Sequence, residues 1–326
     1  MKVNLIALLR VYLRGILILM HKSVLLLEVI NYLNVKEDGI YVDATLGYGG
    51  HSSLILKSLR SGHLYAIDQD EMAIESSRER LSKVSDNYTI IKANFANMKD
   101  ELNKRGITSV DGIIFDLGVS SPQLDNSERG FSFHNDAILD MRMDRDNELD
   151  AKYVVNNYSY DELVRILRDY GEEKYASSIA RNIVLEREKE EIVTTFELVD
   201  IIKRSMPQRE LKGHHPARKT FQAIRIEVNH ELDVLKVALE DSIDLLKVGG
   251  RLCVITFHSK EDKIVKDIFK KYSEVSNELK GLPFIPEEYS PRIKIIESNL
   301  TPSQEELLDN NRARSAKLRV IEKVRE

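Results

Sequence analysis

Short apolar runs alternate with amphipathic stretches along the first third of the chain. The apolar runs are bounded by polar residues or glycine, as buried strands are, and they lie at residues 40–43, 64–68, 89–93 and 110–116. Helical patterning separates them, near residues 52–59 and at 71–83. Buried strands that alternate with helices are typical of a doubly wound parallel sheet, so we expect an α/β fold.

This alternation stops at about residue 135. From there to about residue 215 the chain is highly charged and has helical periodicity at 161–170, 173–187 and 195–205, with no run comparable to the earlier strands. We therefore expect an all-helical domain at residues 135–215. It would be inserted into an α/β domain formed by residues 20–134 and 216–326.

The α/β pattern resumes after the insertion. We expect one long helix at residues 221–246 that stops at the pair Gly249-Gly250, because glycine commonly ends a helix. The remaining expected elements are a strand at 251–257, a helix at 260–272, a proline-containing loop at 281–291 and an antiparallel pair at 293–297 and 317–324.

The first 19 residues are expected to lie outside the α/β domain. Residues 5–20 are strongly apolar, but Arg10 and Arg14 interrupt them. An arginine near the centre of a membrane helix costs roughly 2.5–3.5 kcal/mol on insertion scales. We expect an extension without a stable membrane partner, and membrane attachment is the less favoured alternative. Met20 directly precedes the globular pattern and is a candidate start of translation.

Composition narrows the setting of the protein. The formal net charge of −5 over 326 residues does not mark a nucleic-acid binder, so any basic surface must be local. The single cysteine, Cys253, lies in an apolar run and cannot form an internal disulfide, which favours the cytoplasm. The eight histidines are scattered without metal-ligand spacing, so we predict no metal site.

The first predicted strand leads into a glycine-rich turn at residues 44–51. Its glycines let the backbone approach a ligand, but the dinucleotide fingerprint needs a further glycine where this chain has Ser52. Asp43 would repel a pyrophosphate and suits a cationic amine or sulfonium. Asp68, at the end of the second strand, is placed to accept hydrogen bonds from ribose hydroxyls. The turn therefore favours S-adenosylmethionine over NAD, with a plain tight turn as the structural alternative.

A polar loop, residues 116–123, follows the fourth strand. Ligands of open α/β sheets bind beyond the carboxyl ends of the strands, so this loop should face the methyl group of the donor. Methyltransferases that act on the amines of bases commonly have an Asp/Asn/Ser-Pro-Pro-aromatic motif here, and Ser121-Pro122-Gln123 matches it in part. A proline-containing turn without catalytic function is the alternative.

Two basic segments stand out in this net acidic chain. Seven Lys/Arg and one Glu lie between Lys203 and Arg225, interleaved with His214, His215 and Phe221, and a second segment lies at residues 312–319. Basic side chains neutralise phosphates and aromatic rings stack on unpaired bases, so the segments indicate RNA contact, with a solvated face as the alternative. The candidate RNA-binding residues are Lys212, His215, Arg218, Lys219, Phe221, Arg225, Arg312 and Arg314.

Two further features keep alternative interpretations. The segments 129–133 and 139–144 are aromatic, methionine-rich and charged where a loop is expected, and their local pattern indicates no definite chemistry. His258 follows the fifth strand. We favour a helix-entry histidine held by local hydrogen bonds over a general base.

These motifs together resemble the bacterial 16S rRNA (cytosine-N4) methyltransferases, the RsmH/MraW family. The resemblance is colinear over residues 20–326, and only scattered positions depart from it: Ser23 replaces a usual proline, Lys260 a frequent leucine and His230 a common serine. The matching segments include His21, 24–29, 43–51, 116–125, 129–133, 139–143, 171–173, 215–226, 257–262 and 312–315.

The resemblance implies a class I, Rossmann-like methyltransferase with an inserted helical domain, acting on N4 of cytosine 1402 in the decoding region of 16S rRNA. It implies S-adenosylmethionine as donor, the small ribosomal subunit as partner and no metal, and leaves the oligomeric state open, with a dimer as one option. The expected cofactor-binding residues are Asp43, Gly47, Gly49, Gly50, His51, Asp68, Phe95, Asp116 and Gln123. The candidate catalytic residues for in-line methyl transfer are Asp116, Ser120, Ser121, Asp140 and His258.

Three other functions remain as alternatives. The first is an amino-methyltransferase of other nucleic acids or of proteins. The second is a non-catalytic RNA-binding factor of ribosome assembly. An NAD oxidoreductase is the least favoured, because of Ser52.

Overall fold

A computed structural model of the chain describes residues 23–213, 215–275, 286 and 289–326. The N-terminal extension, His21, His214 and most of the loop predicted at 281–291 therefore lie outside the described residues. The described part contains one seven-stranded sheet, with strand order β3-β2-β1-β4-β5-β7-β6. The strands are β1 (Ile40–Asp43), β2 (His63–Asp68), β3 (Tyr88–Lys92), β4 (Val110–Asp116), β5 (Leu246–Thr256), β6 (Ile293–Leu300) and β7 (Lys317–Lys323).

Strands β1 to β5 are parallel, and β7 lies antiparallel between β5 and β6. This confirms the predicted doubly wound α/β sheet and its closing antiparallel pair. The order reverses between β1 and β4, since β2 and β3 lie on one side of β1 and β4 and β5 lie on the other. Open α/β sheets bind their ligands at such a switch point, outside the carboxyl ends of the strands.

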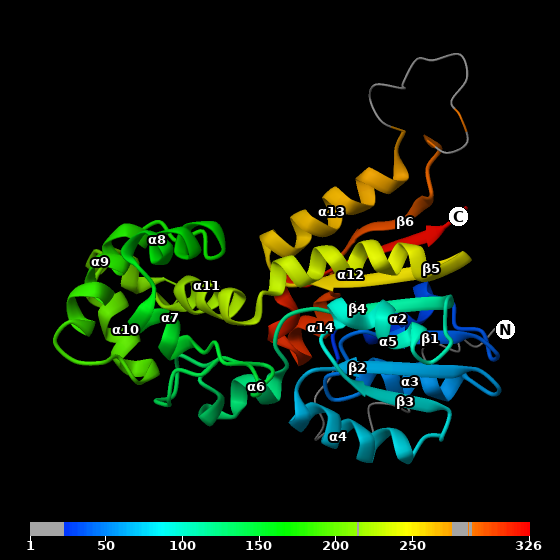
Figure 1. Cartoon of the computed structure of the whole chain (residues 1–326), viewed down its shortest axis with the longest axis horizontal. Helices are drawn as coiled ribbons and strands as arrows, with labels where there is room; N and C mark the ends of the chain where they lie inside the picture. Colours follow the sequence, from blue (N-terminus) through cyan, green and yellow to red (C-terminus); the bar gives the residue numbers. More distant parts are fainter. Residues whose placement is uncertain (1–22, 214, 276–285, 287–288) are drawn as a thin grey trace.

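Helices cover both faces of the sheet (Figure 1). Side chains alternate along a strand, so Ile113 packs in one core and Ile114 in the other, and both cores are apolar. The first core lies against α5 (Met98–Asn103), α12 (Glu231–Leu245) and α13 (Ser259–Ser273). The second lies against α2 (Leu26–Leu33), α3 (Gly50–Ser58) and α4 (Glu71–Ser82).

The insertion is helical and has a hydrophobic core of its own. It comprises α7 (Ala151–Asn157), α8 (Tyr160–Asp169), α9 (Ala176–Arg187), α10 (Thr195–Arg204) and α11 (Arg218–Asn229), which lie to one side of the sheet (Figure 1). Capping boxes at Ser159 and Thr194 begin α8 and α10. The buried residues of this core run from Phe131 to Val228, so the core extends past the predicted boundaries at residues 135 and 215.

The long helix predicted at 221–246 is wrong, because it is two helices. α11 and α12 meet at His230, whose φ of 51° is left-handed and ends α11. The two apolar faces belong to different cores: α11 buries Ile224 in the insertion, whereas α12 buries Leu239 against the sheet. A continuous helix could not direct both faces correctly.

The predicted glycine stop is also wrong. α12 ends at Leu245, and Gly249 and Gly250 lie within β5. There the register against β4 shifts between Val110 and Gly112, which pair with Leu246 and Arg251. The two glycines thus lie at an irregularity near the start of β5, where Gly249 has a φ of 82°.

The remaining described elements are short, and none resembles a membrane span. They are η1 (Phe95–Asn97), α6 (Ser121–Asp125), η2 (Ser127–Arg129), η3 (Gln208–Lys212), α14 (Gln304–Asp309) and η5 (Asn311–Ser315). Among the described residues, no helix has both the length and the apolar character needed to cross a membrane.

Candidate active site

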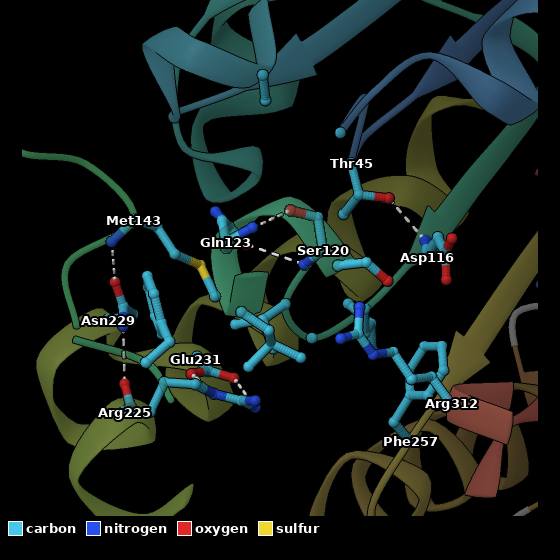
Figure 2. A pocket seen from close by; sticks show the side chains of 18 of the residues that line it. Thr45, Asp116, Ser120, Gln123, Met143, Arg225, Asn229, Glu231, Phe257 and Arg312 are labelled. Atoms are coloured by element: carbon cyan, nitrogen blue, oxygen red, sulfur yellow. Dashed lines mark hydrogen bonds and ion pairs between the residues drawn. The ribbon is translucent and has the colours of Figure 1, made fainter. Parts of the chain in front are cut away.

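A cavity of about 700 Å³ opens at the carboxyl ends of the central strands. One side is formed by the turn after β1, by Asp68 at the end of β2 and by the loop after β4. The other side is formed by the insertion and by Glu231 at the start of α12 (Figure 2). Of the predicted cofactor-binding residues, seven line this cavity: Gly47, Gly50, His51, Asp68, Phe95, Asp116 and Gln123.

The turn after β1 is held in place by Asp68. One carboxylate oxygen of Asp68 accepts the amide hydrogen of Gly47 at 2.7 Å, and the other accepts that of Asp70 at 2.9 Å. Gly47 and Gly49 have φ of 50° and 72°, which glycine adopts without strain. Each oxygen of a carboxylate has a second lone pair, so Asp68 can hold the turn and still accept a ribose hydroxyl.

Asp43 holds the turn through hydrogen bonds and is not among the described residues that line the cavity. Its side chain is buried and accepts hydrogen bonds from the Ser52 hydroxyl at 2.7 Å and the Thr45 amide at 3.2 Å. Ser52 therefore serves the turn as a hydrogen-bond donor, where a dinucleotide fold would have glycine. Gly49 also does not line the cavity. Asp43 and Gly49 thus support the shape of the turn in the free protein. Their predicted contact with the donor stays a prediction.

Asp116 ends β4 and points into the cavity (Figure 2). Its backbone amide donates to the Thr45 hydroxyl at 2.6 Å, which joins the two loops. One carboxylate oxygen lies 3.6 Å from Nδ1 of His51, while the other, Oδ1, is buried and has no hydrogen-bond partner in the described part of the chain. Burial, followed by the charges of Asp43, Glu261 and Glu306, raises the pKa of Asp116 to about 8.

Two more carboxyl groups of this wall have raised pKa values. Burial is the main cause for both, and it raises the pKa of Asp43 and of Asp68 to about 6. Three carboxyl groups near one cavity wall repel one another when ionised. A cation bound there would relieve this repulsion, as the sequence predicted for a sulfonium donor.

The loop after β4 continues into α6 through a capping box. The Ser120 hydroxyl accepts the amide hydrogen of Gln123 at 3.3 Å, and the Gln123 side chain accepts that of Ser120 at 2.9 Å. Gln123 is buried and donates from Nε2 to Asp70 at 2.7 Å. Ser120 and Ser121 both line the cavity, as predicted for acceptors near the reacting atoms.

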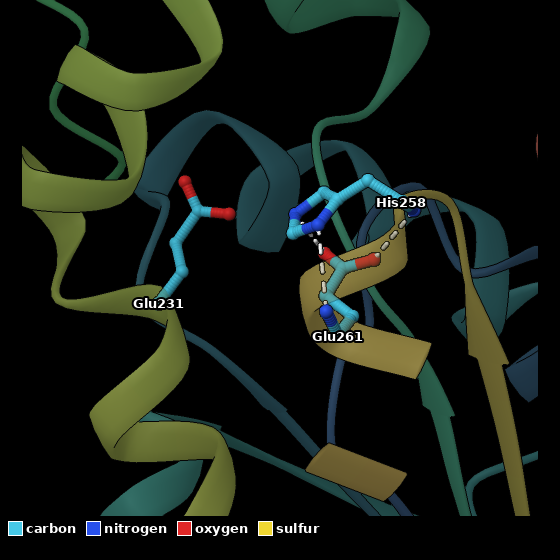
Figure 3. Close-up of side chains that lie close together, drawn as sticks. All are labelled: Glu231, His258 and Glu261. Carbon is cyan, nitrogen blue, oxygen red and sulfur yellow. Dashed lines mark hydrogen bonds and ion pairs between the residues drawn. The ribbon is translucent and has the colours of Figure 1, made fainter. Parts of the chain in front are cut away.

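His258 occupies the N-cap of α13. Its Nδ1 accepts the amide hydrogen of Glu261 at 3.4 Å, and the Glu261 carboxylate accepts from the amides of Phe257 and His258 (Figure 3). This is the local role that we favoured, although His258 also lines the cavity. Asp140 is placed differently: it forms an ion pair with Arg142 at 2.8 Å and is not among the residues that line the cavity in the described part of the chain. Its proton-handling role stays a prediction that this geometry does not support.

Glu231, His258 and Glu261 have potential metal-ligand atoms within 4.8 Å of one another (Figure 3). Both oxygens of Glu231, however, accept hydrogen bonds from the Arg225 guanidinium at 2.7 and 2.8 Å. The positive charge of the Arg225 guanidinium thus neutralises the Glu231 carboxylate, and no metal ion is needed for this. The expectation that the site needs no metal remains a prediction.

The candidate RNA-binding residues fall into two groups. Lys212, Arg218, Arg312 and Arg314 are exposed, and Arg312 pairs with Asp125 at 2.6 Å. The others are engaged within the protein: Lys219 donates to the Glu172 carbonyl, Arg225 binds Glu231, Phe221 is only 3% exposed, and His215 stacks on Phe133. The burial of Phe221 and the ion pair of Arg225 do not support their predicted RNA contacts, which stay a prediction.

Sequence reasoning missed Asp70, which joins three segments at the cavity. One of its oxygens accepts from Gln123 at 2.7 Å and from Arg129 at 2.8 Å, and the Arg129–Asp70 ion pair is almost completely buried. Arg129 belongs to a segment that the sequence singled out without assigning chemistry to it. No local pattern pointed to Asp70, because its partners lie 53 and 59 residues further along the chain.

The sequence of this chain matches the model of the MraW methylase family over residues 18–324. The chain belongs to the MraW methylase family. This membership confirms the predicted methyltransferase activity and its dependence on S-adenosylmethionine. The predicted family and the α/β fold class are confirmed as well.

Relatives of this MraW-family methylase include the ribosomal RNA small subunit methyltransferase H of Exiguobacterium sibiricum. The two are 54% identical over 308 residues, which cover 94% of this chain and 99% of the relative. An rRNA methylase structure from Streptococcus thermophilus is 14% identical, with a TM-score of 0.42, and covers 94% of this chain and 100% of its own. A SAM-dependent O-methyltransferase structure from Thermotoga maritima is 13% identical, with a TM-score of 0.40, and the match covers 92% and 64% of the chains.

Proposed function

We propose that this methylase transfers a methyl group from S-adenosylmethionine to the exocyclic N4 of cytosine 1402 in the decoding region of 16S rRNA. The name of the Exiguobacterium relative, at 54% identity over nearly its full length, supports small-subunit rRNA as the substrate. The carboxyl groups of the cavity support methylation of an amine by a cationic donor. The partner is the small ribosomal subunit, and the compartment is the cytoplasm.

The donor wall fits a cationic ligand. When bound, S-adenosylmethionine supplies an electrophilic methyl group on a positively charged sulfonium. The residues of the chain bind and orient it: the amide-bearing turn approaches closely, Asp68 offers acceptors, and Phe95 contributes an apolar surface to the cavity. Carboxyl groups at the ends of β1, β2 and β4 favour a cation over a pyrophosphate.

The unpartnered Oδ1 of Asp116 is the observation that carries the proposal. A buried carboxylate oxygen without a hydrogen bond is costly, and it is satisfied once a ligand donates to it. The N4 amine of cytosine is such a donor, and its lone pair is delocalised into the ring. Accepting a hydrogen of N4 returns electron density to nitrogen and makes it nucleophilic. Burial raises the pKa of Asp116 to about 8 in the free protein, and the positive charge of a bound donor would favour the carboxylate, which can accept a proton near neutral pH.

Other residues complete the acceptor side. Ser120 and Ser121 lie in the same loop and offer hydroxyl oxygens to the amine. His258 positions Glu261 and the start of α13, so we assign it a positioning role.

The inserted helical domain and the exposed basic side chains would dock the rRNA. Lys212 and Arg218 lie on the insertion side, and Arg312 lies at the mouth of the cavity. Replacing Lys212 and Arg218 by glutamate should raise the KM for the ribosomal substrate at least tenfold and leave donor affinity unchanged. An equal loss of donor affinity would mean that these residues are structural.

The activity is tested with radiolabelled S-adenosylmethionine and 30S subunits that lack the modification. Wild-type protein should label one cytosine, and nucleoside analysis should place the label on N4. The Asp116→Asn variant should fold, bind S-adenosylhomocysteine and lose methylation about 100-fold or more. Label on C5, label at another site or no incorporation would contradict the proposal.

A further inference from the structure

Three aromatic side chains gather on the insertion side of the cavity. The Phe133 ring stacks on His215 with centroids 4.3 Å apart and an interplanar angle of 14°. His134 lies 4.6 Å from Phe133 and 5.3 Å from His215. We call Phe133, His134 and His215 the aromatic platform. Phe133 and His134 line the same cavity as Asp116.

The platform rests on the core of the insertion. Phe133 forms a T-shaped contact with buried Phe221, with centroids 5.5 Å apart and planes at 88°. His215 covers one face of Phe133 and accepts the amide hydrogen of Ala217. The supporting rings leave His134 exposed and Phe133 half-buried on the surface that faces the cavity.

The chain that carries Phe133 is held rigidly just before the ring. Arg129 is buried, forms its ion pair with Asp70 and donates to the carbonyls of Arg142 and Met143 at 2.8 and 3.2 Å. Gly130 has a φ of 68°, and any side chain there would collide with the Ile138 carbonyl oxygen. The segment 129–133, which the sequence left without a function, therefore presents the Phe133 ring in a preorganised arrangement.

The surroundings of the platform indicate what it binds. Arg218 lines the cavity beside it, is exposed and forms no ion pair with the residues that the structure describes. The His134 ring is tilted by 54° from Phe133, so a single base can stack flat on only one of these two rings. Proteins bind unpaired RNA with an aromatic ring beside a cation: the base stacks on the ring and its phosphate pairs with the arginine. His215 suits stacking as a neutral ring, because burial lowers its pKa, and His134 and Lys203 lower it further.

The cavity is large enough for such a ligand beside the donor. Its volume of about 700 Å³ is toward the upper end of the usual range of about 300–1,000 Å³ for small-molecule sites. Its lining comes from two bodies of the protein, since the donor wall belongs to the sheet and the platform belongs to the insertion. A methylated base at Asp116 and a second base on the platform would thus be held by different domains.

We propose that the aromatic platform binds an unpaired nucleobase of the substrate RNA that flanks the methylated cytosine, by stacking on Phe133 beside the tilted His134 ring. This inference rests on the proposed rRNA methylation and adds a recognition subsite to it. The stacked base would fix the register of the RNA strand so that the neighbouring cytosine reaches Asp116.

The test measures the affinity of the full-length protein, saturated with S-adenosylhomocysteine, for two single-stranded RNAs. One contains the target cytosine and its neighbours, and the other has abasic residues in place of those neighbours. Fluorescence anisotropy should show that wild-type protein prefers the first RNA by roughly 5- to 100-fold, the range expected for stacking of one base. A Phe133→Leu variant should lose most of this preference.

Phe196→Leu is the matched control. Phe196 is an exposed phenylalanine of α10 in the same domain and is not among the described residues that line the cavity, so this variant should behave as wild type. Equal preference in wild type and Phe133→Leu, or no preference in wild type, would overturn the platform. An equal loss of S-adenosylhomocysteine affinity in Phe133→Leu would assign the rings to the donor, and would overturn it too.

Failure of the proposed function is seen separately. Anisotropy reports base binding whether or not a methyl group is transferred, whereas label incorporation into 30S subunits reports the reaction. Absent or misplaced label together with a normal preference for the base-containing RNA would contradict the N4 reaction and leave the platform standing.

Discussion

The carboxyl group of Asp116 should make the free protein less stable than a neutral side chain would. Its pKa is raised from an ordinary value of 3.8 to about 8. Folding thus disfavours the charged form, and Asp116→Asn removes the group that is disfavoured. We expect the variant to be more stable than wild type at neutral pH although it is inactive, a trade of stability for function that is common in active sites.

The sign and the size of the effect follow from the two pKa values. Below pH 3.8 the carboxyl group is protonated in both states and contributes no difference. Between pH 3.8 and about 8 it is ionised only when the chain unfolds, so the stability of wild type falls with rising pH relative to the variant. The full shift would amount to about 6 kcal/mol at about 1.4 kcal/mol per pKa unit. Because the side chain is 23% exposed to water in the cavity, we expect about half of this, about 3 kcal/mol.

Urea unfolding at pH 4.5, 6 and 7.5 measures this difference in the free energy of unfolding. The advantage of Asp116→Asn should grow at each step, and an exposed Asp86→Asn variant should show no such trend. The new amide of the Asp116→Asn variant changes the free energy of unfolding by the same amount at every pH. The decisive result is therefore how the difference between variant and wild type changes with pH. A difference independent of pH, or one that shrinks as pH rises, would refute the argument that burial raises this pKa.

Three further changes test other parts of the structure. Asp68→Ala removes the acceptor for the Gly47 and Asp70 amides, so donor affinity measured by calorimetry should fall at least about tenfold. Unchanged affinity would contradict the assignment of this turn to donor binding. His230→Gly should raise the free energy of unfolding by about 0.5–1 kcal/mol, because the left-handed junction of α11 and α12 suits glycine, and a decrease would show that the imidazole is needed there. Dialysis against a chelator should leave S-adenosylhomocysteine affinity unchanged, since Arg225 already neutralises Glu231; a loss restored by added zinc would reveal a metal at Glu231, His258 and Glu261.

Much of the site was predictable because it follows directly from strand ends. Asp68 and Asp116 end β2 and β4, and parallel strands bring their carboxyl ends to one edge of the sheet. The run of residues around Asp43 and the glycines likewise indicates a ligand-binding turn from local chemistry alone. The contacts that the folded protein gives these residues were not predictable, since the Asp43 carboxylate accepts from Ser52 and Asp140 is held by Arg142.

For the basic segments, the sequence pattern did not predict which side chains are exposed. Charge and aromatic residues along residues 203–225 predicted an RNA surface, but Phe221 and Arg225 lie on the inner face of α11. Helix periodicity alone could not tell this face from the exposed one, because the core that buries it is built from residues 131–228. The aromatic platform comes from the same effect, since packing brings His215 onto Phe133 across 82 positions.

The amino-acid sequence was enough to predict the α/β sheet, the presence of a helical insertion, the family and the chemistry of the donor turn. These depend on apolar periodicity and on contiguous motifs, which are local properties of the chain. The break in the long helix, the contacts of Asp70 with two distant segments and the Asp116 oxygen that has no partner among the described residues became visible only in the folded protein. Those features depend on burial and on contacts between distant residues. Because the free energies of desolvation and of hydrogen bonding depend on such surroundings, they become definite only when the chain is folded.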